Sequence, residues 1–151
     1  MDAVCALKDI FAKHERERIC VLGTTCCGKS TLQEKIPGTV DMDEVLWPLL
    51  SQQEEARICQ KPWTSEVGAY AADLVRARLA IEPGHPFFSL IFLECEVLVL
   101  LDIQDDVLRR HCAMRGASFE DAKNVRDAIE GMVCRRREKG GILFYTVAVE
   151  E

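Results

Sequence analysis

The sequence predicts a three-layer α/β/α fold in which helices cover both faces of a parallel sheet of about five strands. Short continuous apolar runs alternate with stretches of helical period, as expected for strands that are buried on both faces. One apolar run leads directly into a glycine-rich loop and then a helix, a strand–loop–helix unit. The length of 151 residues, with 48% hydrophobic and 29% charged residues, is that of one globular domain, residues 1–151.

The first half is expected to contain two strands and several helices. Apolar residues recur at helical spacing from Val4 to Phe11, and Pro37-Gly38 ends the helix after the glycine-rich loop. Lys61-Pro62-Trp63 separates two later helices, with Thr64 or Ser65 as an N-cap. The expected elements are a helix around 4–11, a strand at 19–22, a helix at 30–35, a strand at 39–41, and helices at 43–60 and 64–81.

The second half is expected to supply three strands and two helices. Residues 87–93 and 97–101 are apolar runs of strand length. Asp105 opens a helix that Gly116 ends, and Ser118-x-x-Asp121 resembles a capping box before the next helix. Gly140-Gly141 breaks that helix, and residues 142–149 form the last strand.

Residues 23–30 read Gly-Thr-Thr-Cys-Cys-Gly-Lys-Ser, the G-x-x-x-x-G-K-S pattern of a phosphate-binding loop. Its backbone N–H groups and the helix N-terminus can cradle a polyphosphate, while Lys29 reaches the β/γ-phosphates and Ser30 holds Mg²⁺. A glycine-rich turn without a ligand is the alternative, but such a turn needs no Lys-Ser after its second glycine. We therefore expect ATP and Mg²⁺ as ligands, bound by Gly23, Thr24, Thr25, Cys26, Cys27, Gly28, Lys29, Ser30 and Thr31.

Composition narrows the class of protein. The net charge is −6, with basic residues concentrated after residue 103, which suits a local anionic ligand better than a nucleic-acid coat. The longest apolar stretch is interrupted by Glu94 and Glu96, so two strands explain it better than a membrane span. Neither nucleic acid nor a membrane is expected as a partner.

Eight cysteines are present without a C-x-x-C pair or a signal peptide, and several of them, such as Cys20, Cys95 and Cys112, lie in apolar runs. Free thiols packed as small hydrophobes in a cytoplasmic protein are the expected state. The three histidines show no ligand spacing to the cysteines, so no zinc site is expected.

The absence of an Asn-Lys-x-Asp motif and of an Asp-x-x-Gly switch argues against a GTPase. Beyond the loop, the chain carries an Asp-x-Asp at residues 41–43 and an arginine-bearing helix that is followed by a short turn and another helix. Over roughly residues 18–149 this pattern resembles the superfamily of shikimate, gluconate and nucleoside monophosphate kinases. The resemblance implies a strand order of 2-3-1-4-5 and transfer of the γ-phosphoryl group of ATP to a hydroxyl or phosphate of a small-molecule or nucleotide acceptor.

The resemblance places Asp41 and Asp43 at the acceptor side of the site. In the relatives one aspartate supports Mg²⁺ through water and the other binds the acceptor hydroxyl, a pair of roles that suits carboxylates near a metal. Capping of the following helix is the alternative, because Asp is favoured there in any case.

Arg109, Arg110 and Arg115 share one expected helix. The resemblance implies that arginines here contact the transferred phosphate, the role expected for Arg115, or stack on adenine. The alternative is a solvated helix face with i,i+4 ion pairs from Asp105 to Arg109 and from Asp106 to Arg110.

Two positions are candidates for the second acidic residue that supports the metal. Asp102 follows the better apolar run and is the expected ligand beside Ser30 and Asp41, whereas the topology of the relatives favours the end of the third strand, at Glu94. The acceptor pocket is expected from the segment between the second and third strands, including Trp47, Trp63, Tyr70, His85, Arg57, Arg76 and Arg78.

Two departures from the kinase pattern favour a second function. Ser118 comes only three residues after Arg115, which leaves a very short lid, and the chain ends just after the last expected strand, without the terminal helix of the relatives. A short lid excludes water poorly. A nucleotide-binding regulatory or interaction module is therefore the alternative to the kinase.

Overall fold

The computed structural model describes residues 2–60 and 64–150. Its described residues form one five-stranded sheet in the order β2-β3-β1-β4-β5, and all pairings are parallel. The strands are β1 (Ile19–Leu22), β2 (Val40–Asp41), β3 (Phe87–Ser89), β4 (Val97–Ile103) and β5 (Leu143–Val149). The predicted α/β class, strand count and strand order 2-3-1-4-5 are confirmed.

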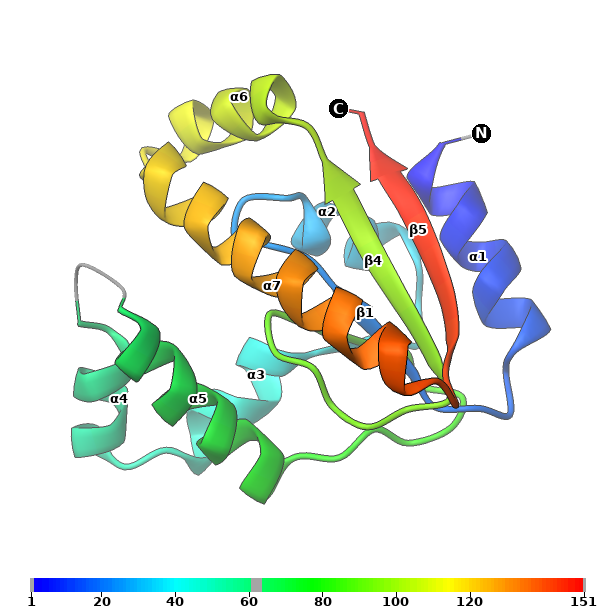
Figure 1. Cartoon of the computed structure of the whole chain (residues 1–151), viewed down its shortest axis with the longest axis horizontal. Helices are drawn as coiled ribbons and strands as arrows, with labels where there is room; N and C mark the ends of the chain where they lie inside the picture. Colours follow the sequence, from blue (N-terminus) through cyan, green and yellow to red (C-terminus); the bar gives the residue numbers. More distant parts are fainter. Residues whose placement is uncertain (1, 61–63, 151) are drawn as a thin grey trace.

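The two faces of the sheet carry separate cores, because successive side chains of a strand point to opposite sides. Ile19 and Val21 join a cluster with α1 (Ala3–Lys13) and α2 (Lys29–Lys35). Cys20 and Leu22 join a second cluster with α3 (Met42–Leu46), α5 (Ser65–Arg78) and the middle of α7 (Phe119–Lys139). Figure 1 shows α7 crossing one face of the sheet, with α1 on the other side.

The single helix predicted over residues 43–60 is wrong, because several shorter elements lie between β2 and α5. α3 ends at Leu46 and a 3₁₀ turn covers Trp47–Leu49, after which α4 spans Gln52–Ile58. Ser51 and Glu54 form a complete capping box at the start of α4. The proposed break at Lys61-Pro62-Trp63 lies outside the described residues, but Thr64 does cap α5 through the Val67 amide.

The strand predicted over 87–93 is also wrong in its length, since β3 ends at Ser89. The Ser89 hydroxyl donates to the Ile91 carbonyl at 2.6 Å and accepts from the Ile91 amide at 2.8 Å, which turns the chain out of the sheet. Phe92 and Leu93 are buried against the face that α5 and α7 cover. The apolar run thus reflects burial of the returning chain rather than a longer strand.

The last two helices follow the prediction closely. α6 spans Asp105–Arg115 and ends at Gly116, which takes the left-handed conformation with φ +66°. Ser118 caps α7 by accepting a hydrogen bond from the Asp121 amide. Only residues 116–118 separate the two helices.

Across residues 2–60 and 64–150, no helix combines the length and the apolar character that crossing a membrane requires.

Candidate functional site

The loop between β1 and α2 is a tight turn with two residues in the left-handed region. Cys26 has φ +63° and Gly28 has φ +95°. Such turns direct successive backbone N–H groups to one side, and this makes a concavity for an anion. Gly23 is required for packing, because a Cβ there would lie 2.6 Å from Cys27 Sγ and 3.1 Å from Leu101 Cδ1.

The ammonium group of Lys29 lies across this loop. Its Nζ donates to the carbonyl oxygens of Gly23 at 2.6 Å and Thr24 at 2.9 Å. The side chain thus places a positive charge at the loop, where it would attract an anionic ligand.

Two contacts from distant parts of the chain hold the loop in place. His111 Nδ1 donates to the Cys26 carbonyl at 2.8 Å, and because a carbonyl only accepts, this nitrogen carries the proton. The buried Thr24 hydroxyl donates to the Ala122 carbonyl at 2.6 Å. His111 was not predicted as part of the site, because its contact with Cys26 spans 85 positions and no local sequence pattern marks it.

A cavity of about 150 Å³ opens beside the loop. It brings together residues from the loop, α2, the β2–α3 junction, the end of β3 and the end of α6. Its lining includes most of the predicted catalytic and phosphate-binding residues: Thr25, Cys26, Cys27, Gly28, Lys29, Ser30, Asp41, Asp43 and Arg115. Thr25 and Arg115, 90 positions apart, therefore meet at the carboxyl edge of the sheet, where ligands of open α/β folds bind.

The two aspartates of this cavity have different environments. Asp41 caps α3, with its Oδ1 accepting the Asp43 amide at 3.2 Å, so the capping alternative holds for one oxygen of this carboxylate. The pKa of Asp43 is raised, first by loss of solvent around the carboxyl and then by the charge of Asp41, while Lys29 lowers it. The raised pKa makes the Asp43 carboxylate a better proton acceptor than an ordinary aspartate.

Three of the predicted loop residues do not line the cavity. The Thr24 side chain is turned into the protein towards Ala122, and Gly23 packs under Cys27. Thr31 is exposed on α2 outside the lining.

Of the three arginines predicted on α6, only Arg115 reaches the cavity. The guanidinium of Arg109 stacks on the Phe119 ring, 4.1 Å from its centroid, and Arg110 is exposed outside the lining. The alternative ion pair of Arg109 is not found in the described residues, since Asp105 pairs with Arg126 at 2.6 Å.

Neither candidate for the second metal-supporting acid lies at the cavity. Asp102 is half-buried near the end of β4 and is not among the lining residues. Glu94 is exposed, five residues past the end of β3, and lies 3.6 Å from Arg136. Ser89 occupies the end of β3 and lines the cavity instead.

The residues predicted for an acceptor pocket are dispersed. Arg57 stacks over Tyr70 at 4.0 Å, Arg78 pairs with Glu54 at 2.6 Å, and none of these lines the cavity beside the loop. Trp47 and His85 are also outside the lining, Arg76 lines a different cavity, and Trp63 lies outside the described residues.

All eight cysteines are free, and Cys20, Cys95 and Cys112 are buried, as the sequence predicts. In the part of the chain that the structure describes, no group of three or more His, Cys, Asp and Glu side chains is arranged to hold a metal ion by itself. Ser30 and Asp41, the other two predicted metal ligands, both line the cavity beside the loop.

No model of a known protein family matches this sequence, and no curated protein matches it either.

Proposed function

We propose that this protein is a P-loop phosphotransferase that moves the γ-phosphoryl group of ATP to a hydroxyl or phosphate of a small-molecule or nucleotide acceptor. The single observation that carries the proposal is the cavity that loop residues 25–30, two aspartates and Arg115 line together. An ammonium group and a guanidinium suit a polyphosphate, and carboxylates beside them suit an acceptor.

The volume of about 150 Å³ is below the usual size of a whole-ligand pocket, so it suits the phosphates, with the nucleoside outside it. The loop amides and Lys29 hold the β- and γ-phosphates, and Arg115 supplies a planar guanidinium for the transferred group.

In the transfer step, the acceptor oxygen forms a bond to the γ-phosphorus while the bond from that phosphorus to the β,γ-bridging oxygen breaks, which releases ADP. The proton of an acceptor hydroxyl passes to Asp43, whose raised pKa favours this transfer. Asp41 orients its neighbour by accepting the backbone amide of Asp43.

Mg²⁺ fits the oxygen atoms that are present. It keeps several waters and takes phosphate oxygens together with one or two protein ligands, so the Ser30 hydroxyl and the second oxygen of Asp41 suffice. When bound there, Mg²⁺ would neutralise charge on the phosphates during transfer.

The short connection between α6 and α7 supports a second function. Residues 116–118 are too few to form a lid that closes over the phosphates, and exclusion of water depends on such closure. A regulatory or interaction module that binds a nucleotide with little or no turnover is the alternative.

The proposal is tested by titrating ATP and GTP, with and without Mg²⁺, into the wild-type protein and the Lys29→Ala variant. We expect binding to the wild type and its loss in the variant, because the one ammonium group that lines the cavity among residues 2–60 and 64–150 is removed. Lys35→Ala, an exposed lysine at the end of the same helix, is the matched control and should bind as the wild type does. Equal affinity in the wild type and Lys29→Ala would contradict the site.

Release of ADP is then followed with panels of nucleosides, nucleotides and sugar acids. An acceptor that raises the rate above that with water identifies the phosphotransferase. Binding without any acceptor-stimulated release favours the regulatory module.

A further inference from the structure

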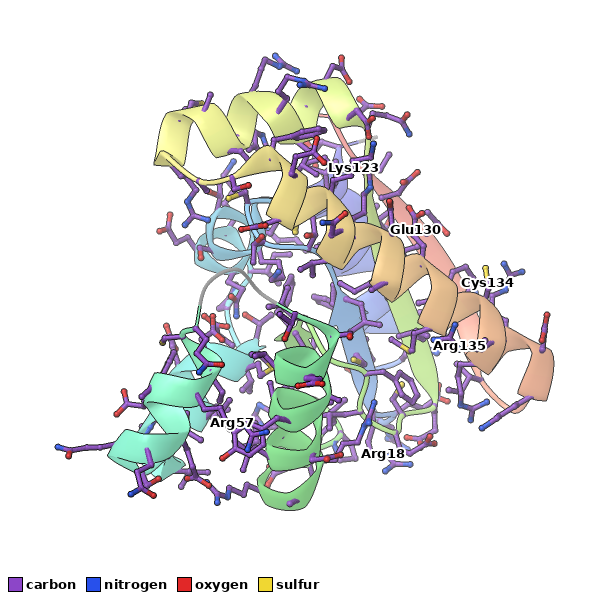
Figure 2. All side chains as sticks on the ribbon, turned by 60° about the vertical axis from the view of Figure 1, so that its left-hand side comes forward. Arg18, Arg57, Lys123, Glu130, Cys134 and Arg135 are labelled. Carbon is purple, nitrogen blue, oxygen red and sulfur yellow. The ribbon has the colours of Figure 1, made fainter. Side chains whose placement is uncertain are left out.

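A second, larger cavity lies at the opposite edge of the sheet from the 23–30 loop. Its volume is about 550 Å³, within the range of small-molecule sites. Arg18 precedes β1, Glu94 precedes β4 and Lys139 precedes β5, so the cavity lies at the amino ends of these parallel strands. Figure 2 shows Arg18 and Arg135 towards the same end of the molecule, away from Lys123 at the start of α7.

The floor of this cavity is apolar. Ile81, Phe92 and Leu93 are each at most 8% exposed and belong to the core on this face of the sheet. Half-buried Leu79 and Met132 extend the floor towards α5 and α7. These side chains offer contact to a ring or an alkyl chain.

The walls are basic, although the chain as a whole has a net charge of −6. Five cations and one acid line the cavity: Arg18, Arg76, Arg135, Arg136, Lys139 and Glu94. On α7 the lining positions 132, 135, 136 and 139 follow helical spacing, so they share the face that is turned to the cavity.

Two of the five cations are neutralised within the protein. Arg18 pairs with Glu96, and Arg136 lies 3.6 Å from Glu94 while donating to the Gly140 carbonyl at 2.7 Å.

The other three cations have no such partner. No carboxylate of residues 2–60 and 64–150 lies within 4.0 Å of the charged groups of Arg76, Arg135 or Lys139. Arg76 bonds only weakly, with its Nε 3.4 Å from the Phe92 carbonyl. Arg135 and Lys139 are one helical turn apart, a like-charge spacing that destabilises a helix.

We propose that this cavity is a binding site for a small organic anion, a carboxylate or a phosphate monoester, that carries an aryl or alkyl body. The anionic group is held by Arg76, Arg135 and Lys139, and the apolar body lies on Phe92 and its neighbours. A guanidinium group can donate two parallel hydrogen bonds to a carboxylate or a phosphate, so the two arginines suit such a group. This site is separate from the loop cavity and does not depend on the phosphotransferase proposal.

Calorimetric titration of the full chain with four naphthalene probes tests the proposal. 1-Naphthoate and 1-naphthyl phosphate are the anions, 1-naphthalenemethanol is the neutral analogue, and 1-naphthylmethylammonium is the cation. We expect at least one anion to bind about tenfold or more tightly than the neutral and cationic probes, since charge-assisted hydrogen bonds are absent from both. The tighter anion identifies the carboxylate or the phosphate as the preferred group.

The double variant Arg135→Gln/Lys139→Gln should weaken anion binding about tenfold or more, because two of the three unpaired cations are lost. Lys123→Gln/Arg137→Gln removes the same charge from the same helix at positions outside the lining, and should change binding less than about twofold. Thermal unfolding of both double variants checks that they are folded.

Three results would overturn the proposal: anion binding no tighter than binding of the neutral probe, equal losses in the two double variants, or loss of anion binding in Lys29→Ala. Because Lys29 lines only the cavity beside the 23–30 loop, that loss would place the probe there.

Discussion

Removal of the His111 side chain is expected to weaken nucleotide binding while the protein stays folded. This side chain reaches from α6 to the loop, where its Nδ1 donates to the Cys26 carbonyl at 2.8 Å. Cys26 holds a left-handed backbone with φ +63°, which is unfavourable for a residue other than glycine. The hydrogen bond therefore fixes a strained residue in the middle of the 23–30 loop.

The size of the effect follows from one hydrogen bond. A net contribution of about 0.5–1.5 kcal/mol is lost in His111→Ala, which corresponds to a decrease in ATP affinity of about 2- to 13-fold if the loop must be ordered by the ligand. Global stability should change by about 1 kcal/mol or less, since the side chain is only half-buried and belongs to neither core cluster.

The assay compares the dissociation constant for ATP with the free energy of unfolding in urea for each variant. His111→Asn places an N–H donor near the position of Nδ1 and should recover part of the affinity. Met114→Ala, at an 85% exposed position of the same helix, is the control and should bind as the wild type does. Unchanged affinity in His111→Ala, or a loss of stability of several kcal/mol with a proportionate loss of binding, would refute this reasoning.

Three further substitutions have defined outcomes. Gly23→Ala should abolish ATP binding and lower stability, because its Cβ would lie 2.6 Å from Cys27 Sγ; titration and urea unfolding measure both effects. Gly131→Ala, in the middle of α7, should raise the melting temperature by about 2–4 °C, since the added Cβ would lie 3.5 Å from Arg135 Nη1, an ordinary contact distance; an unchanged value would show that helix propensity is not limiting there. Glu54→Gln should lower stability at neutral pH. The hydrogen bond from Arg78 lowers the pKa of Glu54 from 4.5 to about 2. The stabilisation from the ionised Glu54 carboxylate is therefore complete above pH 4.5 and is lost as the pH falls towards 2. Urea unfolding of wild type and variant should therefore converge in acid, and a constant difference would contradict the pKa assignment.

The part of the fold nearest the loop could be predicted because its signals are local. An apolar run, two glycines and Lys29-Ser30 lie within twelve residues and determine a strand, a turn and a helix in one order. The break of the helix predicted over 43–60 was also marked locally, by Pro48 and by the Ser51-x-x-Glu54 box, but helical composition outweighed both signals. Apolar runs indicated burial correctly and strand length less well, as the end of β3 at Ser89 shows.

The contacts that complete the candidate site could not be predicted, because they join distant positions. Thr24 bonds to Ala122 across 98 positions and His111 to Cys26 across 85, and neither pair has a spacing rule. Arg115 could be distinguished from its neighbours by its place at the helix end, whereas stacking of Arg109 on Phe119 depends on how α6 meets α7.

The two cavities lie at opposite ends of the parallel strands, and the distance between them decides whether their ligands can interfere. The cavity beside the 23–30 loop lies after the end of β1. The cavity proposed to bind an organic anion lies before the start of β1, next to Arg18 and to Lys139 at the end of α7. Strand β1 lies between them, and the five residue steps from Arg18 to Gly23 span about 17 Å at about 3.3 Å per residue. Charges that far apart are screened at physiological salt, since the Debye length is about 8 Å. An anion among Arg76, Arg135 and Lys139 should therefore leave the affinity of the loop for ATP unchanged, and binding measured with both ligands present should equal the sum of binding measured with each alone.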